Sequence, residues 1–119
     1  MDFRRKEDFR WISLLRVPEF VTEAEFAWAR DEAVRKKNLD CGGAKLMTLR
    51  EGLCVQILHL GPFDAEPVSI RRMEGFIAAQ GYRPDFSPAR RHHEIYLSDA
   101  RRVPPEKRRT VIRLPIAPL

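Results

Sequence analysis

The sequence predicts an α+β protein, an antiparallel sheet with two helices packed on one face, in the order β-α-β-β-α-β-β. Apolar residues recur at helical spacing in two segments, within residues 22–37 and between Pro67 and Gly81. Residues 53–60 are almost continuously apolar, and residues 93–98 alternate with period two. The chain has 119 residues, of which 44% are hydrophobic, and no linker or low-complexity tract divides it. We therefore expect a single domain over residues 1–119.

The first half supplies two strands and the first helix. Residues 9–17 read as a strand that Pro18 ends, and residues 45–49 read as a second short strand. Between them a helix over residues 22–37 is predicted, because Thr22 and Glu25 have the spacing of a capping box. Two glycines mark residues 38–44 as a loop.

The second half supplies three strands and the second helix. The apolar run at 53–60 predicts a strand with both faces covered. Pro67 suits the first turn of a helix, and Gly81 suits the left-handed residue that ends one. Residues 82–91 read as a loop, and the last two strands are expected at 93–98 and 110–116.

The charge and cysteine content exclude several classes of protein. Lys and Arg number 22 against 17 Asp and Glu, a formal net charge of +5, but the excess is scattered and no nucleic-acid reading element accompanies it. Nucleic acid is therefore not expected as a partner. Two cysteines do not make a disulfide framework. No stretch approaches the roughly 20 apolar residues that span a bilayer, and no signal peptide is visible, which predicts a cytoplasmic protein without membrane partners.

The strand at 93–98 carries the main candidate site. Its alternation places Glu94 and Tyr96 on the same face. Burying a carboxylate costs several kcal/mol unless a partner compensates it. Glu94 is therefore expected either to meet a ligand or to form an ion pair, for example with Arg113 on a neighbouring strand. Burial would raise the pKa of Glu94, which suits a general base.

Other residues are weaker candidates, each with a structural alternative. Tyr96 could stack on a ligand or donate its hydroxyl group, or it could belong to the core. Trp11 could line a cleft and Phe63 could gate it, or both could simply pack. Gln56 is polar within an apolar strand, so its amide needs a partner. His59 could contact a ligand, although a backbone carbonyl is the commoner partner for such a histidine.

Metal binding is not expected from this pattern. His92 and His93 are adjacent, so a strand directs them to opposite faces, and no third ligand is evident. The sequence thus predicts no metal and no cofactor.

Residues 51–64, which include Gln-Ile-Leu-His-Leu-Gly-Pro-Phe-Asp, together with residues 66–67, 92–99 (His-His-Glu-Ile-Tyr-Leu-Ser-Asp) and 110–113, resemble the GyrI-like small-molecule-binding proteins. These are related to effector-binding domains of bacterial multidrug-responsive activators. The resemblance implies two β-α-β-β (SHS2-type) modules around a cleft, of which this chain has one complete and part of another. It also places Glu94 and Tyr96 in the cleft.

The resemblance implies binding of a hydrophobic, aromatic or cationic small molecule around Glu94 and Tyr96, in drug sensing or detoxification. Trp11, Gln56, His59 and Phe63 are the other ligand-contact candidates. A first alternative is a hydrolase that opens the cyclopropane of DNA-alkylating natural products, with Glu94 as general base and Tyr96 as its partner. A second alternative is a protein-interaction module acting on a topoisomerase. Because the chain is N-terminally short for the family, a homodimer is expected to complete the cleft.

Overall fold

The computed structural model describes residues 10–119, which fall into two compact units, residues 10–49 and 50–119. Within residues 10–49 the one regular element is helix α1 (Glu23–Lys37). The predicted capping box is confirmed, since Thr22 and Glu25 bond reciprocally at the helix start. Asn38, in the left-handed conformation, ends the helix.

The two strands predicted in this unit are wrong. Residues 10–17 and 45–49 have irregular backbone, and Phe9 lies outside the described residues. An alternating pattern forms a strand only where a neighbouring strand accepts its backbone hydrogen bonds. Neither segment has such a partner among the described residues.

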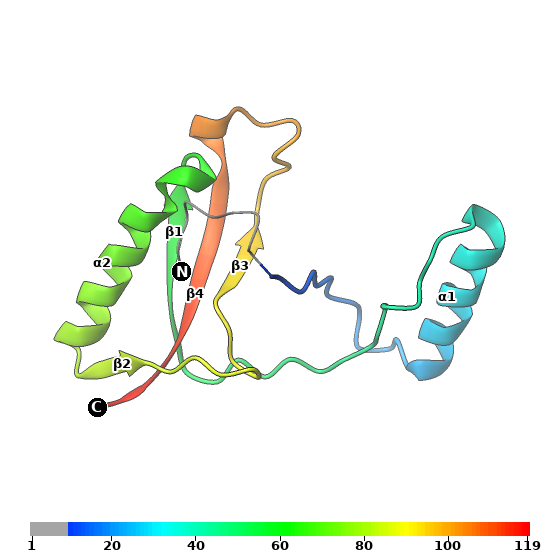
Figure 1. The fold of residues 1–119 in the computed structure, drawn as a ribbon, viewed down its shortest axis with the longest axis horizontal. Coiled ribbons are helices and arrows are strands. Elements are labelled where there is room, and N and C mark those ends of the chain that lie inside the picture. Colours follow the sequence, from blue (N-terminus) through cyan, green and yellow to red (C-terminus); the bar gives the residue numbers. More distant parts are fainter. Residues whose placement is uncertain (1–9) are drawn as a thin grey trace. The chain divides into compact units, whose positions relative to one another are not determined.

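The unit at residues 50–119 is a four-stranded antiparallel sheet with one helix (Figure 1). Strand β4 (Arg109–Pro118) is central. It pairs with β1 (Cys54–Leu60) on one side and with β3 (His93–Tyr96) and β2 (Tyr82–Pro84) on the other. Strand β2 lies where a loop was predicted. The α+β class with an antiparallel sheet is confirmed.

Helix α2 (Glu66–Ala79) follows a short 3-10 turn, η2 (Phe63–Ala65), and runs alongside β1 and β4 in Figure 1. Pro67 occupies its first turn, and Gly81, with φ 81°, follows its end, as the sequence predicts. A second 3-10 turn, η3 (Pro105–Lys107), leads into β4. In the described part of the chain, no helix is long and apolar enough to cross a membrane.

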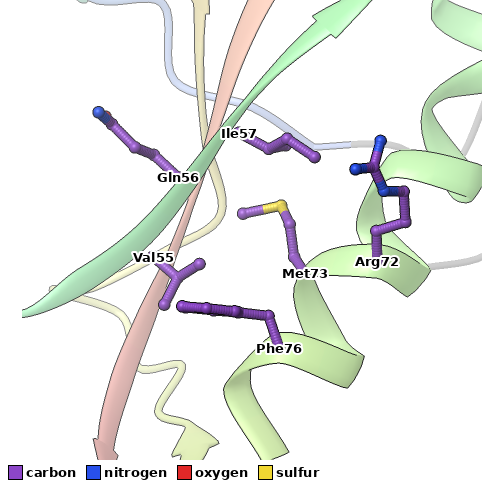
Figure 2. Close-up of a pocket in the computed structure, with 6 residues that line it drawn as sticks. All are labelled: Val55, Gln56, Ile57, Arg72, Met73 and Phe76. Carbon is purple, nitrogen blue, oxygen red and sulfur yellow. The ribbon is translucent and has the colours of Figure 1, made fainter. Parts of the chain in front are cut away.

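The core of this unit lies between α2 and one face of the sheet. Its buried residues come from the helix and from the central strand: Met73, Ile77, Ile112, Leu114 and Ile116. Val55 and Ile57 on β1 project toward Met73 and Phe76, whereas Gln56 between them points away from the helix (Figure 2). The register therefore defines two faces, and we call the one under α2 the helix face.

The opposite face is less covered than the sequence predicts. Leu58 is 49% exposed and Leu60 65% exposed, so the expectation that both faces of this strand are covered is wrong. A polar network crosses the same face. Glu51 accepts a hydrogen bond from Arg113 Nη1 at 2.6 Å and bonds to His93 Nδ1 at 2.6 Å.

Candidate functional site

Two carboxyl groups from different elements meet at the edge of the helix face. Glu94 on β3 is opposite Ile112, which is opposite Ile57 on β1, so Glu94 lies on the side that α2 covers. Glu66 is the first residue of α2 and is 1% exposed. One carboxyl oxygen from each glutamate and a ring nitrogen of His92 lie within 4.8 Å of one another.

The two carboxyl groups hold one proton between them at neutral pH. Burial raises the pKa of Glu66 to about 8, and its hydrogen bond to Glu94 and the charge of Glu94 add to this effect. Burial also acts to raise the pKa of Glu94, but the hydrogen bonds from His92 and Glu66 outweigh it and leave the pKa below its ordinary value. The pair therefore combines a neutral acid, Glu66, with a carboxylate, Glu94.

This distribution corrects the expectation that burial gives Glu94 a raised pKa. The raised value belongs to Glu66, because His92 bonds to Glu94 and stabilises its ionised form, whereas burial and the neighbouring Glu94 act on Glu66 without such a partner. The alternative ion pair with Arg113 is also wrong, since Arg113 lies on the opposite face and pairs with Glu51 at 2.6 Å. His92 is the basic partner of Glu94, with Nε2 at 3.1 Å from Oε2.

Tyr96 and Phe63 extend the site from the carboxyl pair. Tyr96 follows Glu94 on the same face, as predicted, and is 62% exposed. Partial burial, with the charges of Glu94 and Glu66, raises the pKa of Tyr96, so it is a neutral phenol and a hydrogen-bond donor. Phe63 meets the Tyr96 ring edge-on, with centroids 5.6 Å apart.

Arg108 adds a cation at the far end of these aromatic rings. Its guanidinium carbon lies 5.1 Å from the centre of the Phe63 ring. Both residues line a pocket of about 230 Å³, together with Pro62, Asp64 and Pro105. The side chains thus run from an acidic pair through a phenol and a phenyl ring to a guanidinium group.

His59 has a structural role in this arrangement. It is buried on β1, and its Nε2 lies 2.9 Å from the Pro62 carbonyl, which can only accept a hydrogen bond. Its Nδ1 lies 2.7 Å from the Ser69 hydroxyl on α2. With both ring nitrogens engaged, His59 fixes the η2 turn and the start of α2, and thereby the position of Glu66.

Two predicted ligand contacts lie elsewhere. Gln56 is on the opposite face, where its Oε1 accepts a hydrogen bond from Arg113 Nε at 2.8 Å. Trp11 belongs to the unit at residues 10–49, where it lies in irregular backbone instead of a strand and is 77% exposed. Its role as a ligand contact stays a prediction.

Sequence reasoning missed Glu66 as a site residue. An acidic residue in the first turn of a helix normally faces solvent and favours the helix dipole, so the pattern gives no reason to bury it. One signal could have identified it. Glu66 precedes Pro67 in one of the segments that carry the family resemblance, shortly after the turn that follows a buried strand. Arg108 was missed because its neighbours in the sequence are also basic and polar.

The cluster also bears on metal binding. The sequence shows no third ligand beside the two histidines, but the fold brings one imidazole and two carboxyl groups together. The absence of a metal stays a prediction.

Comparison with known proteins agrees with this geometry. The model of the GyrI-like small-molecule-binding domain matches residues 17–117. The chain belongs to this family. The matched residues belong to both units and include the residues of the candidate site, and the model describes a domain that binds small molecules. A comparison with curated protein sequences found no significant match.

Solved structures give the same fold. A hydrolase from Listeria innocua is 43% identical with a TM-score of 0.80, and an uncharacterized conserved protein from the same organism is 44% identical with a TM-score of 0.81. Each alignment covers 86% of this chain, but 52% and 50%, respectively, of the other. The chain thus spans about half the length of these proteins.

Proposed function

We propose that this GyrI-like chain binds a hydrophobic, aromatic or cationic small molecule around Glu94 and Tyr96, in drug sensing or detoxification. The observation that carries the proposal is the ionised, half-buried carboxylate of Glu94 beside the exposed ring of Tyr96. A carboxylate in partly desolvated surroundings attracts a cation more strongly than one in water. Tyr96 and Phe63 offer the flat apolar contact that an aromatic cation needs.

The test is a calorimetric titration with tetraphenylphosphonium, compared with neutral triphenylphosphine oxide. Glu94→Gln keeps the shape of the side chain and removes its charge. We expect it to weaken binding of the cation at least tenfold and to change binding of the neutral compound little. The control is Glu74→Gln, an exposed charge on α2. Equal cation affinities for Glu94→Gln and wild type would overturn the proposal, as would no binding by either protein.

A second candidate function is hydrolysis, favoured by the neighbour described as a hydrolase and by the acid–base character of the pair. Glu94 would take a proton from water while the water oxygen attacks the cyclopropane carbon of a DNA-alkylating natural product. The ring carbon–carbon bond breaks, its electron pair moves to the conjugated oxygen, and the Tyr96 hydroxyl donates a hydrogen bond to that oxygen.

The two functions are separated by turnover. For a hydrolase, Glu94→Gln should abolish ring opening, measured by chromatography of the product, and Tyr96→Phe should slow it at least tenfold. Unchanged turnover in Glu94→Gln would contradict the hydrolase proposal. A topoisomerase partner is the remaining alternative, and it predicts that Glu94→Gln leaves inhibition or protection of the topoisomerase unchanged.

We also propose a homodimer. The apolar side chains Leu58 and Leu60 are exposed on the face opposite α2, and a second copy could cover them. Light scattering coupled to gel filtration should give twice the mass of the chain, and Leu58→Lys with Leu60→Lys should give the single mass. A monomer for the unaltered chain at micromolar concentration would refute the dimer.

A further inference from the structure

Glu66 is a buried carboxyl group that packing alone does not explain. It is 1% exposed, and its Oε1 atom has no hydrogen-bond partner among the described residues. A buried polar atom without a partner costs free energy, so a site that contains one usually has another purpose. Glu66 also makes no capping bond for α2, whose N-cap residue is Ala65.

The groups around Glu66 favour its protonated form. Its nearest charged neighbour is another carboxylate, Glu94 on β3, and one carboxyl oxygen of each group lies within 4.8 Å of the other. Two carboxyl groups this close and this poorly solvated favour a state in which one of them keeps its proton. The other titratable groups around the pair are His92 and Tyr96, with His59 on β1. On the β4 side, Thr110 is buried and Arg108 is directed to the Phe63 ring. No lysine or arginine is paired with either member of the pair among the described residues.

We propose that Glu66 is a second functional carboxyl group of the ligand site, and that the pair takes up a cationic ligand by exchanging its shared proton for the charge of the ligand. This inference rests on the proposed binding function. Without ligand the pair holds one proton and one negative charge. When a cation binds, the second carboxyl group ionises and the proton passes to the solvent, so the total charge of the filled site stays the same. A neutral ligand leaves the proton in place.

The exchange selects ligands by charge. A cation bound beside the pair stabilises both carboxylates, which lowers the affinity of the pair for its proton. By linkage, raising the pH must increase the affinity for the cation by up to about tenfold for each pH unit, as long as one proton is released. The affinity for a neutral aromatic compound should not change in this way.

The experiment measures proton release during calorimetric titration with tetraphenylphosphonium at pH 7.5. Titrations in phosphate and in Tris, which differ in ionisation enthalpy, give the number of protons released per bound cation. We expect more than half a proton from wild type and from Glu74→Gln, and close to none from Glu66→Gln. We also expect the affinity of wild type to rise several-fold between pH 7 and 8.5, and that of Glu66→Gln to stay level. Equal proton release in wild type and Glu66→Gln would overturn the inference.

A measurement without ligand keeps the two proposals apart. Carbon-13 NMR of the glutamate side chains, recorded across the pH range, should show one carboxyl group that titrates near neutral or alkaline pH and is missing in Glu66→Gln. If this group is absent from wild type, the inference is wrong whether or not the cation binds. If the group is present and tetraphenylphosphonium does not bind, the binding function itself is wrong.

Discussion

Replacing Glu66 by glutamine should stabilise the protein at neutral pH. Glutamine has the same shape, its amide can donate a hydrogen bond to Glu94, and it needs no proton to remain buried. Wild-type Glu66 is ionised in the unfolded chain at pH 7 but protonated in the fold, because burial raises its pKa from 4.5 to about 8. Folding must therefore take up a proton at a pH where protons are scarce.

The size of the effect follows from this difference. Keeping the proton at pH 7 on a group with an ordinary pKa of 4.5 costs about 3 kcal/mol of folding free energy. This is an upper limit, because the same hydrogen bond lowers the pKa of Glu94 and returns part of the cost. A raised carboxyl pKa means that the contribution of Glu66 to stability is greatest below pH 4.5 and is lost as the pH rises to about 8.

The assay is urea unfolding at pH 4.5, 7 and 8.5, followed by far-UV circular dichroism because both tryptophans lie outside the 50–119 unit. We expect Glu66→Gln and wild type to be equally stable at pH 4.5 and to diverge progressively above it, with the variant more stable. The exposed control Glu74→Gln should follow wild type throughout. Parallel curves for Glu66→Gln and wild type, or a variant that is less stable at pH 8.5, would show that burying Glu66 does not require a proton.

Three other substitutions test the surrounding structure. Thr110→Val should leave the free energy of unfolding unchanged or raise it by about 1 kcal/mol, because the buried Thr110 hydroxyl has no partner among the described residues; a clear loss in urea unfolding would contradict this. Arg90→Met should lower the free energy of unfolding by about 2 kcal/mol in the same assay. The Arg90 guanidinium group binds Asp85 and the backbone carbonyls of Glu51, Leu53 and Ile116. A loss below about 0.5 kcal/mol would be inconsistent with that role. Glu51→Gln should lower the free energy of unfolding by about 1 kcal/mol at pH 7. The hydrogen bond from His93 and the charge of Arg113 lower the pKa of Glu51, which means that they stabilise its carboxylate in the folded protein. That difference should disappear as the pH falls below the ordinary pKa of 4.5, and a difference that persists in acid would exclude this cause.

The sequence predicts the unit at 50–119 well because its signals are local and agree with one another. The apolar run of β1, the Pro67 and Gly81 limits of α2 and the alternation of β3 each fix an element without knowledge of the rest. The alternation also places Glu94 and Tyr96 together, since side-chain direction in a strand depends only on the period. At residues 10–17 and 45–49 the pattern lacks a partner strand, which no local signal reveals.

The carboxyl pair could not be predicted in the same way. Glu66 and Glu94 are distant in the sequence, and they meet only because β3 pairs with β4 while the η2 turn folds α2 back over the sheet. Which of the two keeps the proton depends on small differences in burial and on the His92 hydrogen bond. A sequence pattern contains neither quantity. For the same reason Gln56, which looks like a ligand contact in the strand, instead bonds Arg113 across the sheet.

The proposed ligand-binding pair of Glu66 and Glu94 depends on the proton that the two groups share. Carbon-13 NMR of the Glu66 carboxyl group at pH 7.5, before and after addition of tetraphenylphosphonium, follows this proton. We expect a largely protonated carboxyl group that moves to its ionised chemical shift as the cation saturates the site. A Glu66 resonance that is already ionised without ligand, or that stays protonated when the bound cation is at saturation, would exclude the exchange of the proton for the cation.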